Sequence, residues 1–149
     1  MKLKKAVTFH GYVAEEEKVK LLAKSWAAIQ PSQMEGWGIT VIEANAAGTP
    51  VIASNVKGLQ DSVNDGLTGI LAPAGNVTQF ANAMMKIAED NELRDKFSQD
   101  ARLWAKNFDW NKSAETFYNL LGKDFERETI IPTYSENMFS TTEKSINNA

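Results

Sequence analysis

Two glutamates, Glu35 and Glu43, enclose a short segment whose residue types could bind hydroxyl groups and a phosphate. A carboxylate accepts hydrogen bonds, and the vicinal hydroxyl groups of a sugar donate a pair of them. Eight residues of helix span about 12 Å, comparable with the separation of the two sugars in a nucleotide-sugar. With the diphosphate held between them, Glu43 would bind the ribose and Glu35 the hexose.

The residues between the two glutamates are a glycine-containing loop and the start of a helix. Gly36 and Gly38 leave room for a ligand to approach the backbone. The N–H groups near Ile39 and Thr40, in the first helical turn, suit a phosphate group. An alternative places Glu35 in the first turn of the helix, where the dipole favours an acid, and Glu43 on a solvated face. Spacing alone leaves both interpretations open.

Composition excludes several other classes of protein. The chain has 149 residues, 43% of them hydrophobic and 23% charged, which is enough for one domain with a core. Its formal net charge of −3 argues against a nucleic acid as the main partner. There is no cysteine, hence no disulfide framework or thiolate metal site. Apolar runs are far shorter than the roughly 20 residues of a membrane span, so we expect a cytoplasmic protein.

The order of the expected elements predicts an α/β protein with a parallel sheet. Short apolar strands are expected at residues 6–11, 27–29, 51–54 and 68–73, with helices between them. Strand–helix–strand alternation over so few residues is typical of βαβ units. The helix that begins near Glu15 would bury a face made of Val19, Leu22 and Trp26. Residues 38–47, 77–88, 91–106 and 112–125 are the other expected helices.

Residues 55–63 are expected to form a loop at the carboxyl end of strand 51–54, on the same side as the glutamate segment. There Gly58 could bring backbone close to a ligand, and Lys57 could meet a phosphate. An ordinary loop with a solvated lysine is the alternative. Toward the C-terminus, we expect the domain to end at residue 127 and residues 128–149, rich in Ser, Thr and Asn, to be a flexible tail.

In this order and spacing, the motifs resemble the C-terminal, donor-binding domain of retaining GT-B glycosyltransferases, specifically glycosyltransferase family 4 (glycosyl transferases group 1). The resemblance runs from Val7 to Leu121 and rests on seven segments: residues 9–13, 30–32, 35–44, 47–54, 58–59, 65–71 and 108–110. It implies a Rossmann-like parallel sheet with flanking helices, the C-terminal half of a GT-B fold truncated at its N-terminus, followed by C-terminal helices.

The resemblance also implies roles for particular residues. Glu35 would be the catalytic residue and contact the donor sugar near its reacting face, while Glu43 would bind the ribose hydroxyls. Trp37 stands where the family usually has Phe or another aromatic residue. The implied donor-binding residues are Gly36, Trp37, Gly38, Ile39, Thr40, Glu43, Gly58 and Leu59.

The implied reaction transfers a hexosyl unit from a UDP-, GDP- or ADP-sugar to an acceptor hydroxyl, with retention and without a divalent metal or other cofactor. The acceptor and the donor base stay unspecified. In this family an earlier strand, a glycine-rich loop, and an Arg and a Lys that neutralise the diphosphate would precede residue 1. Lys57 is not an obvious replacement for that pair, so the chain would carry half a donor site.

Three interpretations of this half-site follow. In the first, the chain is a fragment, or the product of a split reading frame, of a glycosyltransferase. In the second, it acts together with a separate chain that supplies the missing N-terminal half, in an enzyme that is cytoplasmic or membrane-peripheral. Alternatively, it is a non-catalytic module that binds a nucleotide-sugar or another protein. An incomplete sheet would expose an apolar edge, so we expect a homodimer or a partner chain to cover it.

Overall fold

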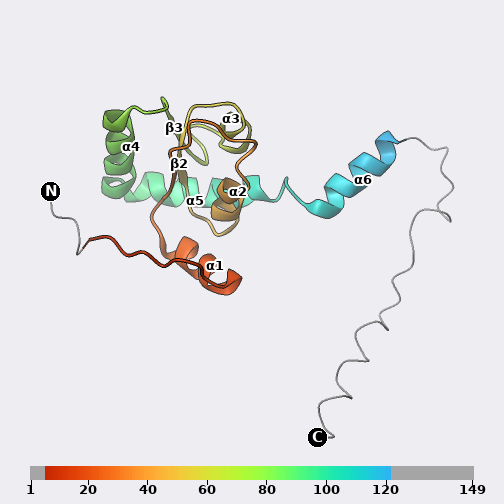
Figure 1. Cartoon of the computed structure of the whole chain (residues 1–149), viewed down its shortest axis with the longest axis horizontal. Coiled ribbons are helices and arrows are strands. Elements are labelled where there is room, and N and C mark those ends of the chain that lie inside the picture. The colour runs from red at the N-terminus through yellow and green to blue at the C-terminus, as the bar shows by residue number, and fades with distance from the viewer. Residues whose placement is uncertain (1–5, 122–149) are drawn as a thin grey trace, which may run out of the picture. The chain divides into compact units, whose positions relative to one another are not determined.

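The computed structural model describes residues 6–121, which fall into two compact units that are described separately. The first ends at Asp109 and contains, in chain order, α1 (Glu15–Lys24), β1 (Ala28–Gln30), α2 (Ile39–Ala46), β2 (Val51–Ser54), α3 (Leu59–Ser62), β3 (Gly69–Ala72), α4 (Val77–Glu89) and α5 (Asn91–Ala105) (Figure 1). The second begins at Trp110 and contains α6 (Trp110–Leu120).

The three strands form one parallel sheet in the order β1-β2-β3. Ala28 pairs with Val51, and Val51 pairs in turn with Gly69. A Cβ at Gly69 would collide with the Val51 carbonyl oxygen, so only glycine permits this approach of β3 to β2. The parallel sheet expected from the alternation of strands and helices is confirmed.

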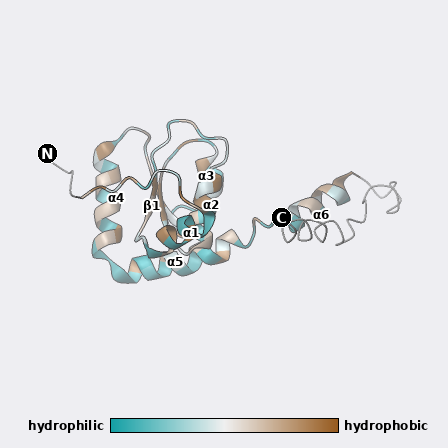
Figure 2. Ribbon diagram, turned by 60° about the horizontal axis from the view of Figure 1, so that its bottom comes forward, coloured by the Kyte–Doolittle hydropathy of each residue, from teal (hydrophilic) through white to brown (hydrophobic). Residues whose placement is uncertain are grey.

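Helices cover both faces of the sheet because the buried strand β2 sends alternate side chains to opposite sides. Val51 and Ala53 join a cluster with α2 and α3, including Val41 and Leu59. Ile52 points to the other cluster, which contains Ala83 and Ile87 of α4 and Phe97 of α5. Figure 2 shows hydrophilic residues along most of the visible length of α5. The expected fold class is therefore confirmed.

The starts of α4 and α5 follow from capping side chains. The Asn76 side-chain oxygen accepts a hydrogen bond from the Gln79 N–H at 3.0 Å, as expected for an N-cap. Asp90 does the same for the Leu93 N–H at 2.9 Å, which ends α4 and begins α5 within one residue. These two helices match the ranges expected from the sequence to within one residue.

Three expectations fail in the first unit. Residues 6–11, expected as a strand, form none and pair with none of the three described strands. Of the stripe expected to be buried on the helix that begins near Glu15, only Leu22 packs against the core. Val19 is 49% exposed, and Trp26, which is 61% exposed, lies beyond the end of α1 at Lys24. The expected loop at residues 55–63 contains the one-turn helix α3.

Other expectations concern residues that the structure does not describe. The domain end at residue 127 and the tail at residues 128–149 lie outside the described residues, as does any continuation of the last helix beyond residue 121. That helix begins at Trp110, two residues before the expected start. None of the helices within residues 6–121 is long and apolar enough to cross a membrane.

Strand β1 has one uncovered edge, since its only partner among the described strands is β2. Next to this strand lies an apolar groove of about 480 Å³. Its walls come from the segment between α1 and β1, from β1 and β2, and from α4, and they include Trp26, Ile29, Met84 and Met85. The exposed apolar edge expected from the sequence is therefore present in this unit.

The core of the second face gives a test of the fold. Phe97 is 2% exposed, whereas Leu103 on the same helix is 62% exposed. We expect Phe97→Ala to lower the free energy of unfolding by about 3–5 kcal/mol, through lost burial and a residual cavity. Leu103→Ala should change it by no more than about 0.5 kcal/mol. Urea denaturation of both variants measures this, and equal effects would contradict the packing described for α5.

Candidate functional site

The segment that carries the expected site leaves the carboxyl end of β1 and enters α2. In an α/β sheet ligands bind at this edge. Gly38 is the N-cap residue of α2, with φ of +78°, and no side chain caps the helix start. A Cβ at Gly38 would come within 2.7 Å of the Leu59 side chain. The first N–H groups of α2, at Ile39 and Thr40, thus follow a glycine that packs tightly on α3.

Glu35 lies in this loop and not in the first turn of α2, which contains no acidic residue. One carboxylate oxygen, Oε2, accepts hydrogen bonds from Gln30 Nε2 at 3.0 Å and from Ser32 Oγ at 3.2 Å. Gln30 Nε2 also lies 2.9 Å from Ser32 Oγ, so the three side chains form one small network. The other oxygen, Oε1, has no partner among residues 6–121. Glu35 is thus oriented by its neighbours, with one oxygen left to accept a ligand hydroxyl.

Gly58 holds the loop after β2 against the Glu35 loop. Its φ is +87°, and a Cβ there would collide with the carbonyl oxygens of Glu35 and Gly36. Gly36, in contrast, has open space where a Cβ would be. The backbone of the two loops is therefore in contact, while Gly36 faces an unobstructed surface.

An aromatic cluster anchors the same loop to α5. The Trp37 ring packs edge-on against Phe108, with 4.8 Å between ring centroids, and Phe108 packs against Trp104 at 5.2 Å. Trp104 Nε1 donates a hydrogen bond to the Ser62 carbonyl oxygen at 2.8 Å, which connects α5 to α3. The Trp37 ring is thus engaged by the protein, and its expected part in donor binding stays a prediction.

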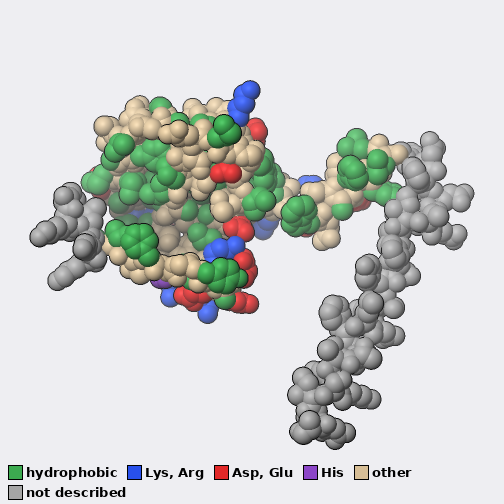
Figure 3. All heavy atoms as spheres, viewed as in Figure 1, with side chains coloured by type: hydrophobic (Ala, Val, Ile, Leu, Met, Phe, Trp, Pro, Cys, Tyr) green, Lys and Arg blue, Asp and Glu red, His purple; other side chains and the backbone are tan. Residues whose placement is uncertain are grey.

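Glu43, on α2, is paired with a lysine that sequence reasoning did not select. Lys18 Nζ of α1 lies 3.0 Å from Glu43 Oε1 and 2.9 Å from Glu15 Oε1. The Lys18 and Glu43 side chains are 34% and 35% exposed, so Glu43 is not on a fully solvated face. Figure 3 shows acidic and basic side chains gathered over the α1 region. In the sequence, Lys18 is simply a lysine that follows the acidic start of a helix. It lies 25 residues before Glu43, so no local pattern predicts that the two side chains pair.

Hydrogen bonds to the Glu15 carboxylate and then to Glu43 raise the pKa of Lys18 above its ordinary value of 10.5. Because the pKa is higher in the folded state, the charged Lys18 stabilises the fold at pH values below 10.5. This contribution is lost as the pH rises through the raised pKa. Lys18 is therefore charged at neutral pH.

A pocket of about 210 Å³ lies between α1, β1 and α2. Its polar walls are Lys18, Gln30, Thr40 and Glu43, and its apolar walls include Leu22 and Val41. Since Gln30 also donates to Glu35, the pocket that contains Glu43 ends beside the Glu35 network. The structure therefore brings both predicted glutamates to one region through Gln30.

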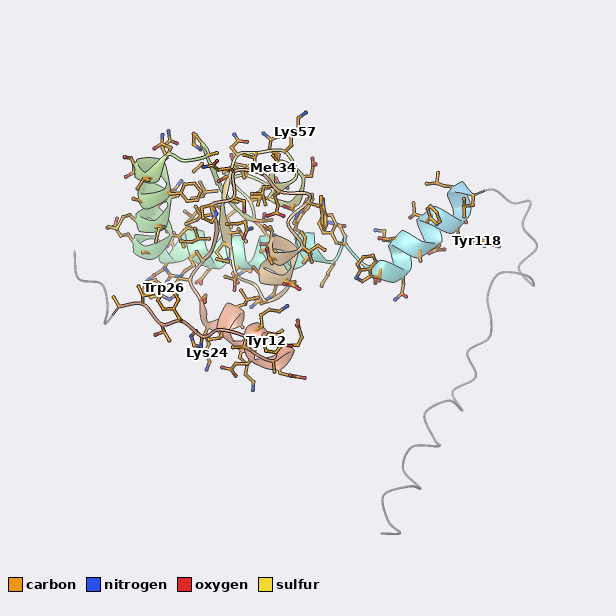
Figure 4. The ribbon with its side chains drawn as sticks, in the orientation of Figure 1. Tyr12, Lys24, Trp26, Met34, Lys57 and Tyr118 are labelled. Atoms are coloured by element: carbon orange, nitrogen blue, oxygen red, sulfur yellow. The ribbon has the colours of Figure 1, made fainter. Side chains whose placement is uncertain are left out.

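Two further candidates occupy different positions. Leu59 is fully buried in the core, so only its backbone could meet a ligand. Lys57 is exposed, and Figure 4 shows its side chain pointing away from the unit, near Met34 of the Glu35 loop. Among residues 6–121 there is no group of three or more His, Cys, Asp or Glu that could hold a metal ion.

Comparison with known proteins assigns the family. The family described as Glycosyl transferases group 1 matches residues 1–104. This chain belongs to that family. A D-inositol 3-phosphate glycosyltransferase of Kribbella flavida is 42% identical over 86 residues, 58% of this chain and 20% of that protein. One from Stackebrandtia nassauensis is 32% identical over 130 residues, 87% of this chain and 29% of that protein. The chain thus spans less than a third of these curated relatives.

Solved structures of glycosyltransferases have the same fold. Sucrose-phosphate synthase from Thermosynechococcus elongatus superposes with a TM-score of 0.76 and 33% identity, over 80% of this chain and 30% of that one. Anabaena Alr3699/HepE, solved in complex with UDP, gives a TM-score of 0.74 and 26% identity, over 80% of this chain and 33% of that one. The resemblance to GT-B glycosyltransferases is confirmed, and the three-stranded unit is part of that Rossmann-like fold.

The contact at Gly58 can be tested against a glycine that shares its positive φ but lacks the neighbours. Gly75 has φ of +75° and open space where a Cβ would be. We expect Gly75→Ala to cost about 1–2 kcal/mol of stability, from the positive φ alone. Gly58→Ala should cost more, because its methyl group must also displace the backbone of the Glu35 loop. Thermal unfolding of both variants measures the difference, and equal losses would show that the two loops are not in contact.

Proposed function

We propose that this chain binds the nucleoside-diphosphate sugar of a retaining hexosyltransferase. The observation that carries the proposal is the orientation of Glu35: Gln30 and Ser32 hold one oxygen, and the other is free for a sugar hydroxyl. Glu43 would accept hydrogen bonds from the ribose hydroxyls at the pocket beyond Gln30. The family assignment and the fold support this arrangement.

In the proposed complex the diphosphate lies between the two glutamates, over the N-terminus of α2. Backbone N–H groups from Gly36 to Thr40, including those of Gly38 and Ile39, and the helix dipole favour negative charge there. Negative charge grows on the diphosphate as its bond to the anomeric carbon breaks, so groups aimed at it stabilise the transition state. Gly58 and the Leu59 backbone would border the phosphate or base, and Trp37 would keep the loop in place.

Sugar transfer also requires a place for the acceptor. The chain covers 20% and 29% of the two relatives compared above, so we propose that transfer occurs together with an N-terminal half. The donor is a UDP-, GDP- or ADP-sugar, with UDP as the first choice because the similar HepE was solved with UDP. Metal independence and a cytoplasmic location stay predictions.

Calorimetric titration of the full chain with UDP, GDP, ADP and their glucose or mannose conjugates tests donor binding. We expect one nucleotide to bind, and Glu43→Ala to weaken both the nucleotide and its conjugate by about tenfold or more. Glu35→Ala should leave the nucleotide unchanged and remove the additional affinity of the sugar conjugate. The physical reason is that Glu43 contacts the ribose, whereas Glu35 contacts only the sugar.

Glu16→Ala is the matched control, because Glu16 is an exposed carboxylate on α1 that does not line the pocket. It should bind all ligands like the unmodified chain. If folded protein binds none of the nucleotides, this half-site does not bind the donor by itself and the proposal fails for the chain alone.

The uncovered β1 edge and the apolar groove favour a second candidate function, a protein-interaction module. Met85 lines the groove and is exposed, whereas the similarly exposed Leu103 on α5 lies outside it. If a second copy covers this face, the chain self-associates, and Met85→Lys weakens the association by placing a charge in an apolar interface. Leu103→Lys should have no effect.

Light scattering and sedimentation at increasing protein concentration measure this association. A monomer at every concentration would exclude the homodimer. An association that Met85→Lys leaves intact would place the interface elsewhere.

A further inference from the structure

Lys18 connects α1 to the ribose side of the proposed donor site. Its ammonium group lies between Glu15 Oε1, at 2.9 Å, and Glu43 Oε1, at 3.0 Å. The Glu15 contact is within α1, but the Glu43 contact joins α1 to α2. Lys18 also forms part of the wall of the pocket that Glu43, Gln30 and Thr40 line.

Glu43 resembles Glu35 in that a neighbouring side chain binds only one of its two carboxylate oxygens. Lys18 occupies Oε1 of Glu43, and Oε2 has no partner among residues 6–121. Gln30 and Ser32 likewise occupy one oxygen of Glu35. Lys18 of α1 thus fixes the Glu43 carboxylate, and Gln30 at the end of β1 fixes the Glu35 carboxylate. In each glutamate one oxygen is left available.

Stability alone is a poor explanation for the pair. Both side chains are about one-third exposed, and exposed ion pairs contribute little to folding. Preorganisation is a better explanation, because a carboxylate that is already oriented loses less rotamer freedom when it binds a ligand.

We propose that Lys18 is a positioning residue for nucleotide binding, which orients Glu43 toward the ribose through an ion pair with Oε1. This inference rests on the proposed function, since it assigns Glu43 to the ribose. It assigns α1 a part in the donor site, although its acidic first turn and lysines indicate only helix formation.

The test is calorimetric titration of the full chain with UDP. Lys18→Met keeps the apolar stem of the side chain and removes the charge, and we expect it to weaken UDP binding about tenfold. Lys18→Arg should restore most of the affinity, because a guanidinium group can donate to both carboxylates. Lys20→Met, at an exposed position of α1 that does not line the pocket, should bind like the unmodified chain. Thermal unfolding confirms that each variant is folded.

A double-mutant cycle with Glu43→Gln separates positioning from direct contact. If Lys18 acts through Glu43, Lys18→Met has little further effect once Glu43 is replaced. Additive losses would overturn the proposal and indicate that Lys18 contacts the nucleotide directly. Unchanged affinity in Lys18→Met would also overturn it, and tighter binding would show that Lys18 competes with the ribose. If the unmodified folded chain does not bind UDP, both this inference and the proposal that the isolated chain binds UDP are wrong. If the unmodified chain binds UDP and Lys18→Met binds it equally well, only this inference is wrong.

Discussion

The parallel pairing of β1 with β2 is the constraint on which the candidate site depends. Because parallel strands end at the same edge, the Glu35 loop after β1 and the Gly58 loop after β2 leave the sheet side by side. Gly58 then allows backbone contact, since any Cβ would collide with the Glu35 and Gly36 carbonyl oxygens. The loop that carries Glu35 therefore follows β1 directly and contacts the loop after β2 through Gly58.

The two glutamates are held by different physical means. Glu35 receives two neutral donors, Gln30 and Ser32, that lie within five residues of it in the chain. Glu43 receives a charged donor, Lys18, from a helix 25 residues earlier. The first arrangement forms within one strand–loop segment, whereas the second requires α1 to pack beside α2. Nucleotide binding, as proposed above, is therefore coupled to the docking of α1 in this unit.

The same sheet that presents the site also leaves β1 without a neighbour on one side. Strand β2 is buried on both faces and paired at both edges, whereas Ile29 of β1 is exposed beside the apolar groove. Residues 6–11 have the composition of a strand but pair with none of the three described strands, because β-propensity alone does not produce strand pairing. Among the described residues, β1 therefore keeps one edge without a paired strand.

The sequence by itself determined the fold class, the strand at Val51–Ser54, the capping residue Asn76 and the family, because these depend on local patterns and on motif order. It also placed the loop that carries Glu35 after the end of a strand, since strand ends and glycines are local signals. Only the tertiary structure decided the partners of the two glutamates, the backbone contact at Gly58, the aromatic cluster at Trp37 and the exposure of Trp26. Most of these depend on which segments lie side by side in space, and hydrophobic periodicity and spacing carry no such information.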